Sequence, residues 1–325
     1  TKNKINLKLV IACVIFWSSP LYSISQCLDY VTFRDCSFLG KKSKYALDWD
    51  KVFTKLNGWT GGDVSRSYKL QDGRIIWLFG DSMLGPIVDG KHGPLSEMIS
   101  NSIAISKDHN TKFYWNSANL KPKGYFSPNL SSLEKSKFSE KYKKIVTWPT
   151  GDIVQDGDTI FFFTDAIGIK ANVDSVWGFE TVYNSIHKVE NIDKDPSAWR
   201  VEELRIPHNQ KDNNILWGTS VYFNKNENIF YIYGIKIDGY RKDLVVARTT
   251  SIVEFGDWQF FYNGNWSKNP SKVTVIARDI AMETTVSKAK NSRGEDYFIL
   301  THSETYFGKS IVIRKSKSPL GPWSI

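Results

Sequence analysis

Three acidic residues stand where this sequence could assemble acid–base chemistry. Asp63 and Asp152 each follow a glycine, in similar stretches that begin with tryptophan, and Glu283 precedes two threonines at the start of a later strand pattern. One carboxyl that donates a proton and a second, ionised carboxyl that activates water or attacks the sugar can together cleave a glycosidic bond. We therefore take Asp63, Asp152 and Glu283 as candidate catalytic residues. The competing interpretation is structural: carboxylates at strand starts often bind nearby backbone amides or remain exposed charges.

Five other side chains could contact a substrate. Trp59, Trp148 and Trp217 recur just before predicted strands. As exposed rings they would stack on sugar faces, and as buried rings they would belong to the core. Arg66 could hold a substrate carboxylate or form a structural ion pair. Asp81 ends a predicted strand and could reach a neighbouring loop or serve a structural role.

One predicted hairpin organises these residues. Its strands span 64–70 and 74–79, and Asp72-Gly73 supplies the turn because this pair tolerates the positive φ of a tight hairpin. Asp63 and Asp81 flank its outer ends, beside glycines that permit close approach of a ligand. We expect these two carboxylates to lie near each other.

The hairpin pattern returns later in the chain. A Gly-Asp pair, a strand, an Asp-Gly turn and an aromatic strand ending in aspartate recur from Gly151 to Asp165, where a structural role is the simpler expectation for Asp165. Units of four short strands at intervals of about 70 residues are typical of a β-propeller, whose innermost strands would bring equivalent acids to a central channel. A β-sandwich or two unrelated β domains are the alternatives. The predicted strands fall into four rounds: 64–115, 145–206, 215–262 and 282–314.

The composition fits one large β domain. Of 325 residues, 41% are hydrophobic and 14% aromatic, with 12 tryptophans, so a sizeable core can be buried. The 43 Lys and Arg residues exceed the 34 Asp and Glu residues and give a formal net charge of +9. Either a basic surface spread over many loops or attraction to an acidic polymer or membrane surface would explain this charge. Basic runs with interleaved aromatics are lacking, so we expect no nucleic-acid partner.

The N-terminus predicts secretion. Lysines precede an apolar stretch, 9–17, that is too short to span a bilayer, and small residues follow up to Ser25. We expect a signal peptide over 1–25 and a secreted, periplasmic or extracellular protein without stable membrane insertion after cleavage. An uncleaved membrane anchor is the alternative.

The segment after the signal peptide contains two cysteines. Cys27 and Cys36 predict a disulfide in an N-terminal segment, 26–51, because the chain is expected in an oxidising compartment. Two free thiols are the alternative. Cysteine and histidine spacings typical of a metal site are lacking. The propeller domain is expected over 52–325.

Several motifs resemble the five-bladed propeller families of the glycoside hydrolase clans that contain arabinanases, xylosidases and fructosidases. The nearest likeness is to a secreted bacterial group of domains of unknown function related to endo-D-arabinanases. The motifs span most of residues 52–323 and are Trp59-Thr60-Gly61-Gly62-Asp63, Trp77-Leu78-Phe79-Gly80-Asp81-Ser82, Trp148-Pro149-Thr150-Gly151-Asp152, Trp217-Gly218, Tyr231-Ile232-Tyr233-Gly234 and Ser318-Pro319-Leu320-Gly321-Pro322-Trp323.

The resemblance implies an all-β fold, a five-bladed β-propeller of four-stranded blades. These families usually have a fifth blade after the Gly-Pro-Trp motif. Because this chain begins with Thr1 and ends at Ile325, we expect a fragment that lacks the last blade.

The resemblance also implies a function. It points to a secreted, monomeric glycoside hydrolase that acts on an arabinan-like or other polysaccharide and needs no cofactor; a channel calcium ion is not indicated. A non-catalytic propeller that binds glycans or proteins at the cell surface is the alternative, since the fold alone does not imply catalysis. Thr219 and Ser220 stand where the third round would need an acid, which favours the alternative.

Overall fold

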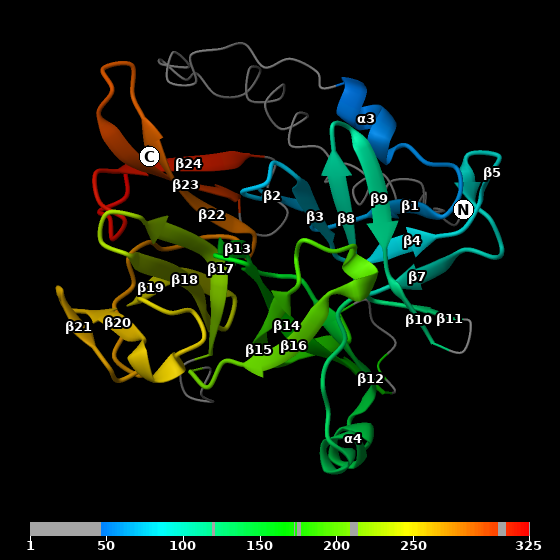
Figure 1. Ribbon diagram of the computed structural model, residues 1–325. Helices are drawn as coiled ribbons and strands as arrows, with labels where there is room; N and C mark the ends of the chain where they lie inside the picture. Colours follow the sequence, from blue (N-terminus) through cyan, green and yellow to red (C-terminus); the bar gives the residue numbers. More distant parts are fainter. Residues whose placement is uncertain are drawn as a thin grey trace, which may run out of the picture.

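The computed structural model describes residues 47–118, 121–171, 173, 177–208, 214–304 and 310–324. The expected signal peptide and the cysteines Cys27 and Cys36 lie outside these residues. Strands dominate the described chain (Figure 1). Its helical elements are α3 (Leu47–Phe53), α4 (Ser132–Ser139), η2 (Pro196–Ala198) and η3 (Phe255–Asp257).

Four antiparallel sheets carry most of the core. Sheet 1 contains β2 (Arg66–Lys69), β3 (Ile75–Phe79), β8 (Ser102–Lys107) and β9 (Asn110–Tyr114). Sheet 2 contains β12 (Tyr142–Trp148), β13 (Ile153–Asp156), β14 (Thr159–Lys170), β15 (Phe179–Glu190) and β16 (Arg200–Arg205). Sheet 3 contains β17 (Ile215–Asn224), β18 (Ile229–Asp238), β19 (Arg241–Thr249), β20 (Gln259–Tyr262) and β21 (Asn265–Ser267). Sheet 4 contains β22 (Thr284–Lys290), β23 (Asp296–Ser303) and β24 (Ile311–Ser316).

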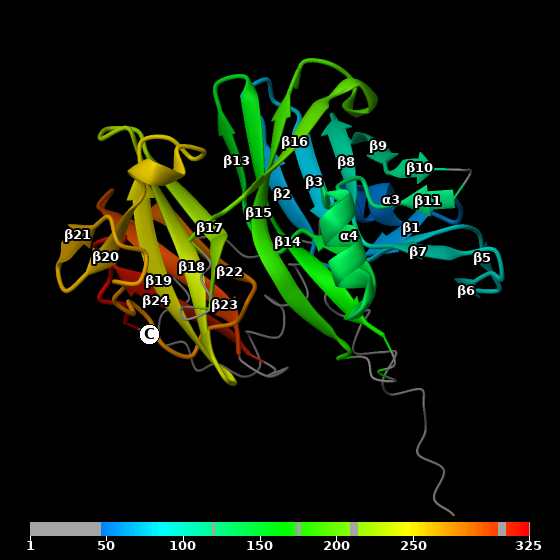
Figure 2. The ribbon, with the colours of Figure 1, turned by 90° about the horizontal axis from the view of Figure 1, so that it is seen from below.

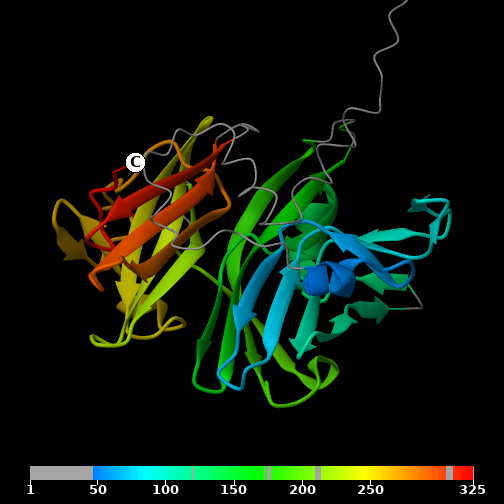
Figure 3. The ribbon, with the colours of Figure 1, turned by 90° about the horizontal axis from the view of Figure 1, so that it is seen from above.

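Smaller elements extend sheet 1. Further sheets are formed by β1 (Trp59–Gly62), β4 (Ser82–Leu84) and β7 (Glu97–Ile99), by β5 (Ile87–Val88) and β6 (Lys91–His92), and by β10 (Asn116–Ala118) and β11 (Lys121–Lys123). Helix α3 lies against sheet 1 (Figure 3), where the Phe53 ring is 4.7 Å from the Trp77 ring and 6.1 Å from the Trp59 ring. The helix therefore crosses the domain boundary expected at residue 52 and packs with the first sheet.

Neighbouring sheets contact each other through their early strands. β2 contacts β13, β14 contacts β17, and β17 contacts β22. Figure 2 shows sheets 1 and 2 side by side, and sheets 3 and 4 side by side beyond them. Apolar side chains fill the spaces between sheets; between sheets 2 and 3 they include Phe163, Trp217, Phe230 and Phe260. Burial of these faces is the main force that holds the sheets together.

Each of the first two sheets has one buried asparagine that forms hydrogen bonds with the backbone of a later segment. The Asn101 side chain accepts from Phe126 N–H at 2.7 Å and donates to the carbonyl of Thr147 at 2.9 Å. The Asn184 side chain accepts from Trp217 N–H at 2.9 Å and donates to the Trp217 carbonyl at 3.2 Å. We call these residues the asparagine clamps. They satisfy buried backbone groups where no strand ladder can do so.

The strand pattern confirms the four predicted rounds and the predominantly β class of the fold. The count of five blades stays a prediction. Within the first round, the stretch 97–107 is divided into β7 and β8, and Asn101 between them donates its side-chain amide to the Phe126 carbonyl. The short helix α4 stands outside the sheets and begins at a capping box formed by Ser131 and Glu134.

Candidate active site

Asp63 and Asp81 lie together at the junction of sheet 1 with the β1-β4-β7 sheet. Asp63 follows β1 and Asp81 precedes β4, and the Asp63 N–H donates to the Asp81 carbonyl at 3.1 Å. Gly80 permits this approach, because a Cβ at Gly80 would lie 2.3 Å from Asp63 Oδ1. The proximity predicted from the hairpin is confirmed.

The Asp63 carboxyl has a strongly raised pKa. Its pKa is raised from 3.8 to about 7, first by loss of solvation and then by the negative charges of Asp81 and Glu283. The residue is nevertheless exposed to solvent, as is Glu283. An accessible carboxyl that is surrounded by protein and by other carboxylates can hold a proton near neutral pH and still reach a ligand.

Asp81 connects this acidic group to an aromatic strip. Burial raises the pKa of Asp81, while the Lys144 charge and a hydrogen bond with the Trp148 side chain oppose the shift. The Trp148 ring lies 4.8 Å from the Phe179 ring, which lies 6.2 Å from Trp177, a residue that is 63% exposed. Trp148, Phe179 and Trp177 therefore extend outward from the carboxylates as the aromatic strip. Half-buried and exposed rings of this kind can stack on sugar faces.

Asp152 does not share the surroundings of Asp63. Its Oδ1 accepts from Ile153 N–H at 2.9 Å, and its Oδ2 accepts from Val221 N–H at 2.8 Å and from Ser220 Oγ at 3.3 Å. Each carboxylate oxygen thus satisfies backbone amides of β13 or β17. These contacts favour the structural interpretation, in which Asp152 links sheets 2 and 3.

Ser220 and Thr219 continue this linkage toward sheet 4. Val286 N–H of β22 donates to Ser220 Oγ at 2.9 Å, and Thr219 Oγ1 donates to the Met282 carbonyl at 2.7 Å. The hydroxyls that replace an acid in the third round therefore hold β22 in place, directly after Glu283. They thereby fix the start of the strand that follows the candidate carboxylate Glu283.

Two of the tryptophans predicted to bind substrate are core residues. Trp59 is 5% exposed and stacks on Phe113 at 4.4 Å, while its Nε1 donates to Ser102 Oγ at 3.0 Å. Trp217 is 1% exposed and packs against Trp258 and other rings of sheet 3. Their faces are covered by protein, so these two predictions are wrong and the inter-sheet alternative holds. Of the three tryptophans, Trp148 is half-buried and keeps some exposure to solvent.

Two other predicted residues are separate from the carboxylates. Arg66 is half-buried on β2, opposite Leu78, and it is not among the groups that chiefly shift the pKa of Asp63, which are burial and then the charges of Asp81 and Glu283. Asp165 is buried and accepts from Thr150 Oγ1 at 2.6 Å and Asn184 Nδ2 at 2.9 Å, and its burial raises its pKa to about 6. This confirms the structural role expected for Asp165.

Sequence reasoning missed Lys144, Phe179 and Trp177. Their neighbours in the sequence give no motif. Lys144 of β12 acts on Asp81, and the Phe179 ring, with Trp177 beside it, meets the Trp148 ring only because β12 and β15 share a sheet. Among the described residues, no group of three or more His, Cys, Asp or Glu side chains is arranged to hold a metal ion. A search of the same part of the chain finds no helix long and apolar enough to cross a membrane.

The sequence profile of one family matches residues 46–325. That family is described as Domain of unknown function (DUF5005). No curated protein matches the sequence.

Solved structures similar to this chain are distant in sequence. One, described as a "putative hydrolase" from Bacteroides ovatus ATCC 8483, is 19% identical, with 86% of this chain and 72% of that chain covered and a TM-score of 0.63. A thermostable family-43 glycoside hydrolase (12% identical, 79% and 72% covered) and an endo-arabinase from Bacteroides thetaiotaomicron VPI-5482 (10% identical, 80% and 76% covered) give TM-scores of 0.40 and 0.37. The first comparison indicates a shared fold; the other two superpose too loosely to support an argument.

Proposed function

Because the chain belongs to the family described as Domain of unknown function (DUF5005), whose description assigns no activity, its function must be inferred from its own site, and we propose that it is a glycoside hydrolase. We propose that its four sheets are blades of a β-propeller and that the protein is secreted and acts on an arabinan-like or other polysaccharide. The observation that carries the proposal is the exposed Asp63 carboxyl, with a pKa raised to about 7 beside Asp81 and Glu283. The description of the Bacteroides ovatus structure as a hydrolase is in line with it.

The proposed roles follow from this arrangement. Asp63 in its protonated form donates to the glycosidic oxygen as the bond to the leaving sugar breaks. Glu283, an exposed carboxylate, either accepts a proton from the attacking water or attacks the sugar itself. Burial, together with the negative charges of Asp81 and Glu283, keeps the proton on Asp63. The aromatic strip supplies a surface for the sugar rings next to the cleaved bond.

The proposal is tested by incubating the chain with arabinan, xylan, β-glucan and mannan and following the release of new reducing ends. Products from at least one polymer are expected, and the Asp63→Asn variant should release them at least about 10²-fold more slowly. The competing function is that of a non-catalytic glycan-binding protein. Saturable binding of a polymer without any new reducing ends, under conditions from about pH 5 to pH 8, would favour that function instead.

The pH dependence of the reaction should report the Asp63 proton. Because the pKa of Asp63 is raised to about 7, kcat/KM of the wild-type chain should fall as the pH rises through about 7 and the proton donor is lost. Asp81→Asn removes a negative charge that raises this pKa, so the falling limb should move to lower pH. An unchanged limb in Asp81→Asn would show that another group donates the proton.

Trp148 should contribute to substrate affinity more than to folding. Its half-buried ring contacts Phe179 and Asp81, so Trp148→Ala is expected to lower kcat/KM about tenfold, through loss of one stacking contact. Trp266→Ala is the matched control, since Trp266 is also half-buried but lies on β21 beneath Arg248. Equal losses of activity in both variants would contradict a sugar-binding role for Trp148.

A further inference from the structure

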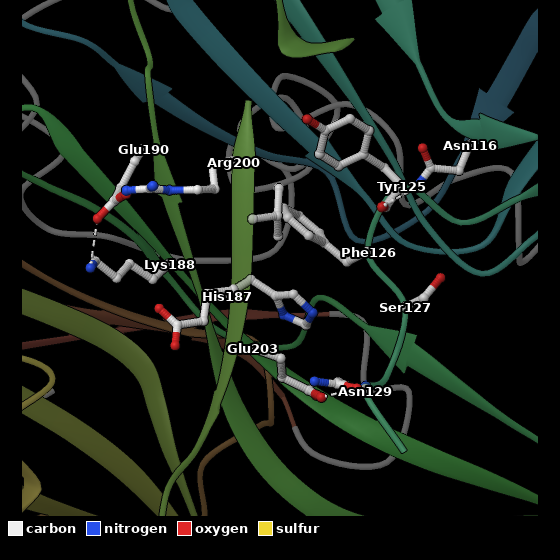
Figure 4. Close-up of a pocket in the computed structure, with 12 residues that line it drawn as sticks. Asn116, Tyr125, Phe126, Ser127, Asn129, His187, Lys188, Glu190, Arg200 and Glu203 are labelled. Atoms are coloured by element: carbon white, nitrogen blue, oxygen red, sulfur yellow. Dashed lines mark hydrogen bonds and ion pairs between the residues drawn. The ribbon is translucent and has the colours of Figure 1, made fainter. Parts of the chain in front are cut away.

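A cavity of about 570 Å³ lies on the outer part of sheet 2, away from the carboxylates of the candidate active site. Its walls are strands β15 and β16 and the segment from Tyr125 to Asn129 (Figure 4). In sheet 2 the order is β12-β14-β15-β16, so the cavity lies at the edge strand, whereas Asp63, Asp81 and Glu283 border the early strands. Its volume falls within the range of roughly 300–1,000 Å³ that is common for small-molecule sites.

Two buried polar atoms in this cavity lack a well-formed hydrogen bond within the protein. Glu203 Oε2 accepts from Asn129 N–H at 2.6 Å and from Tyr183 Oη at 3.2 Å, but Glu203 Oε1 has no hydrogen-bond partner. His187 is 1% exposed; its Nδ1 lies 3.0 Å from Thr164 Oγ1, and its Nε2 meets no acceptor in good hydrogen-bond geometry, while a contact with the Ser127 backbone opposes the fall of the ring's pKa. Buried groups left in this state are costly to folding unless water or a ligand completes them.

The strand register places these two side chains on one face. His187 of β15 pairs directly with Glu203 of β16, so both project to the side that carries the Phe126 ring, 4.7 Å from the imidazole. Figure 4 shows His187 and Glu203 beside Ser127 and Asn129, with Lys188, Glu190 and Arg200 grouped on the opposite side. The cavity therefore presents an acceptor, an imidazole and an apolar ring together.

The charges in the cavity select against anions. Lys188 and Arg200 both form ion pairs with Glu190, which offsets part of their positive charge. Burial lowers the pKa of His187 to about 4 and leaves the ring neutral at physiological pH. Glu202 and Glu203 are further carboxylates of the lining, and they would repel another negative charge.

We propose that this cavity is a second binding site, for one residue of a neutral, hydroxyl-rich carbohydrate. A hydroxyl group both donates and accepts, so one sugar hydroxyl can donate to Glu203 Oε1 while a neighbouring oxygen pairs with His187 Nε2. The exposed Ser127 and Asn129 side chains stand at the rim. This site would hold a polymer at a distance from the carboxylates that cleave it, and it does not depend on catalysis at Asp63.

The test uses the Asp63→Asn chain, which should not consume its ligands, and isothermal titration with neutral arabino-, xylo-, gluco- and manno-oligosaccharides. Glu203→Gln removes the charged acceptor and should weaken binding at least about tenfold. Ser127→Trp blocks the rim from an exposed position without changing a buried group, and should abolish binding at this site even if Glu203→Gln folds poorly. Glu140→Gln, at the exposed end of α4 and outside the cavity lining, is the control and should bind like the parent.

Three results would overturn the proposal. The first is that no sugar binds saturably. The second is that both Glu203→Gln and Ser127→Trp bind sugar as tightly as the parent. The third is that the chain binds calcium from calcium chloride but binds none of the sugars. A sugar whose affinity falls in Trp148→Ala but not in Ser127→Trp binds only at the candidate active site, and that result would also overturn the second site. Hydrolysis that is lost in Asp63→Asn but unaffected by Ser127→Trp keeps the two proposals separable.

Discussion

Asp63→Asn is expected to lower kcat on the cleaved polysaccharide by about 10²–10⁴-fold, the usual contribution of a positioned proton donor. Asparagine preserves the shape of the side chain over Gly80 but cannot give up a proton to the leaving oxygen. Initial rates at saturating substrate measure the effect directly.

The same substitution should not destabilise the fold. The pKa of Asp63 in the folded chain, about 7, lies above its ordinary value of 3.8, so folding favours the protonated form. Its stabilising contribution is fully present below about pH 4 and is lost as the pH rises through about 7. Asp63→Asn, which has no proton to lose, should therefore melt at a higher temperature than the wild-type chain at about pH 8, with the advantage shrinking at lower pH.

Asp152→Asn provides the matched comparison, because Asp152 follows glycine in the same way but binds the amides of Ile153 and Val221. It should lower the melting temperature and leave most of the activity of the folded fraction. If instead Asp152→Asn abolished activity without loss of stability, the assignment of Asp63 and Asp152 to different roles would be wrong.

Trp217→Ala should produce the largest loss of stability, about 3–5 kcal/mol in the free energy of unfolding. The ring is almost wholly buried between sheets 2 and 3, and nothing near it can fill the space without moving Trp258 or Phe260. Gly218 beside it has a φ of +92°, and a Cβ there would lie 1.9 Å from Phe163, so the backbone around the ring is tightly constrained. A urea titration followed by circular dichroism measures the loss.

The control for Trp217→Ala is Trp266→Ala, because Trp266 is half-buried on β21, where its ring packs against Arg248. This change should cost only about 1 kcal/mol. A Trp217→Ala chain that unfolds like the wild type but has lost affinity for oligosaccharides would restore the sugar-stacking role that the sequence suggested.

Most of the strand order could be predicted from local chemistry. Asp-Gly turns at Asp72 and Asp156 and aromatic, β-branched runs after them determine hairpins regardless of distant contacts. The different surroundings of the two aspartates that follow glycine could not be predicted in this way. Asp63 and Asp152 have similar neighbours in sequence, but Ser220 and Val221 approach only Asp152, whereas Asp81 and Glu283 surround only Asp63.

Some features left a signal that the strand pattern alone does not explain. The tripeptide Asn-Ser-Ile occurs at Asn101 and again at Asn184, and both asparagines act as clamps. The cavity of His187 and Glu203 has no recognisable signal in the sequence. These residues lie sixteen positions apart on different strands and meet only through the β15–β16 register. A buried histidine in a strand is read from sequence as core, since the lack of a well-placed acceptor for Nε2 is visible only in three dimensions.

The asparagine clamps also bear on how such a chain can be divided or recombined. The amide of Trp217, on the first strand of sheet 3, is satisfied by Asn184 of sheet 2, and that of Phe126 by Asn101 before β8 of sheet 1. Dividing the chain between β16 and β17 would thus leave the Trp217 backbone amide without its acceptor on one fragment and the Asn184 side chain without its partner on the other. The transferable module is then a sheet together with the segment its asparagine grips, so engineered chimeras should exchange the chain in these overlapping blocks.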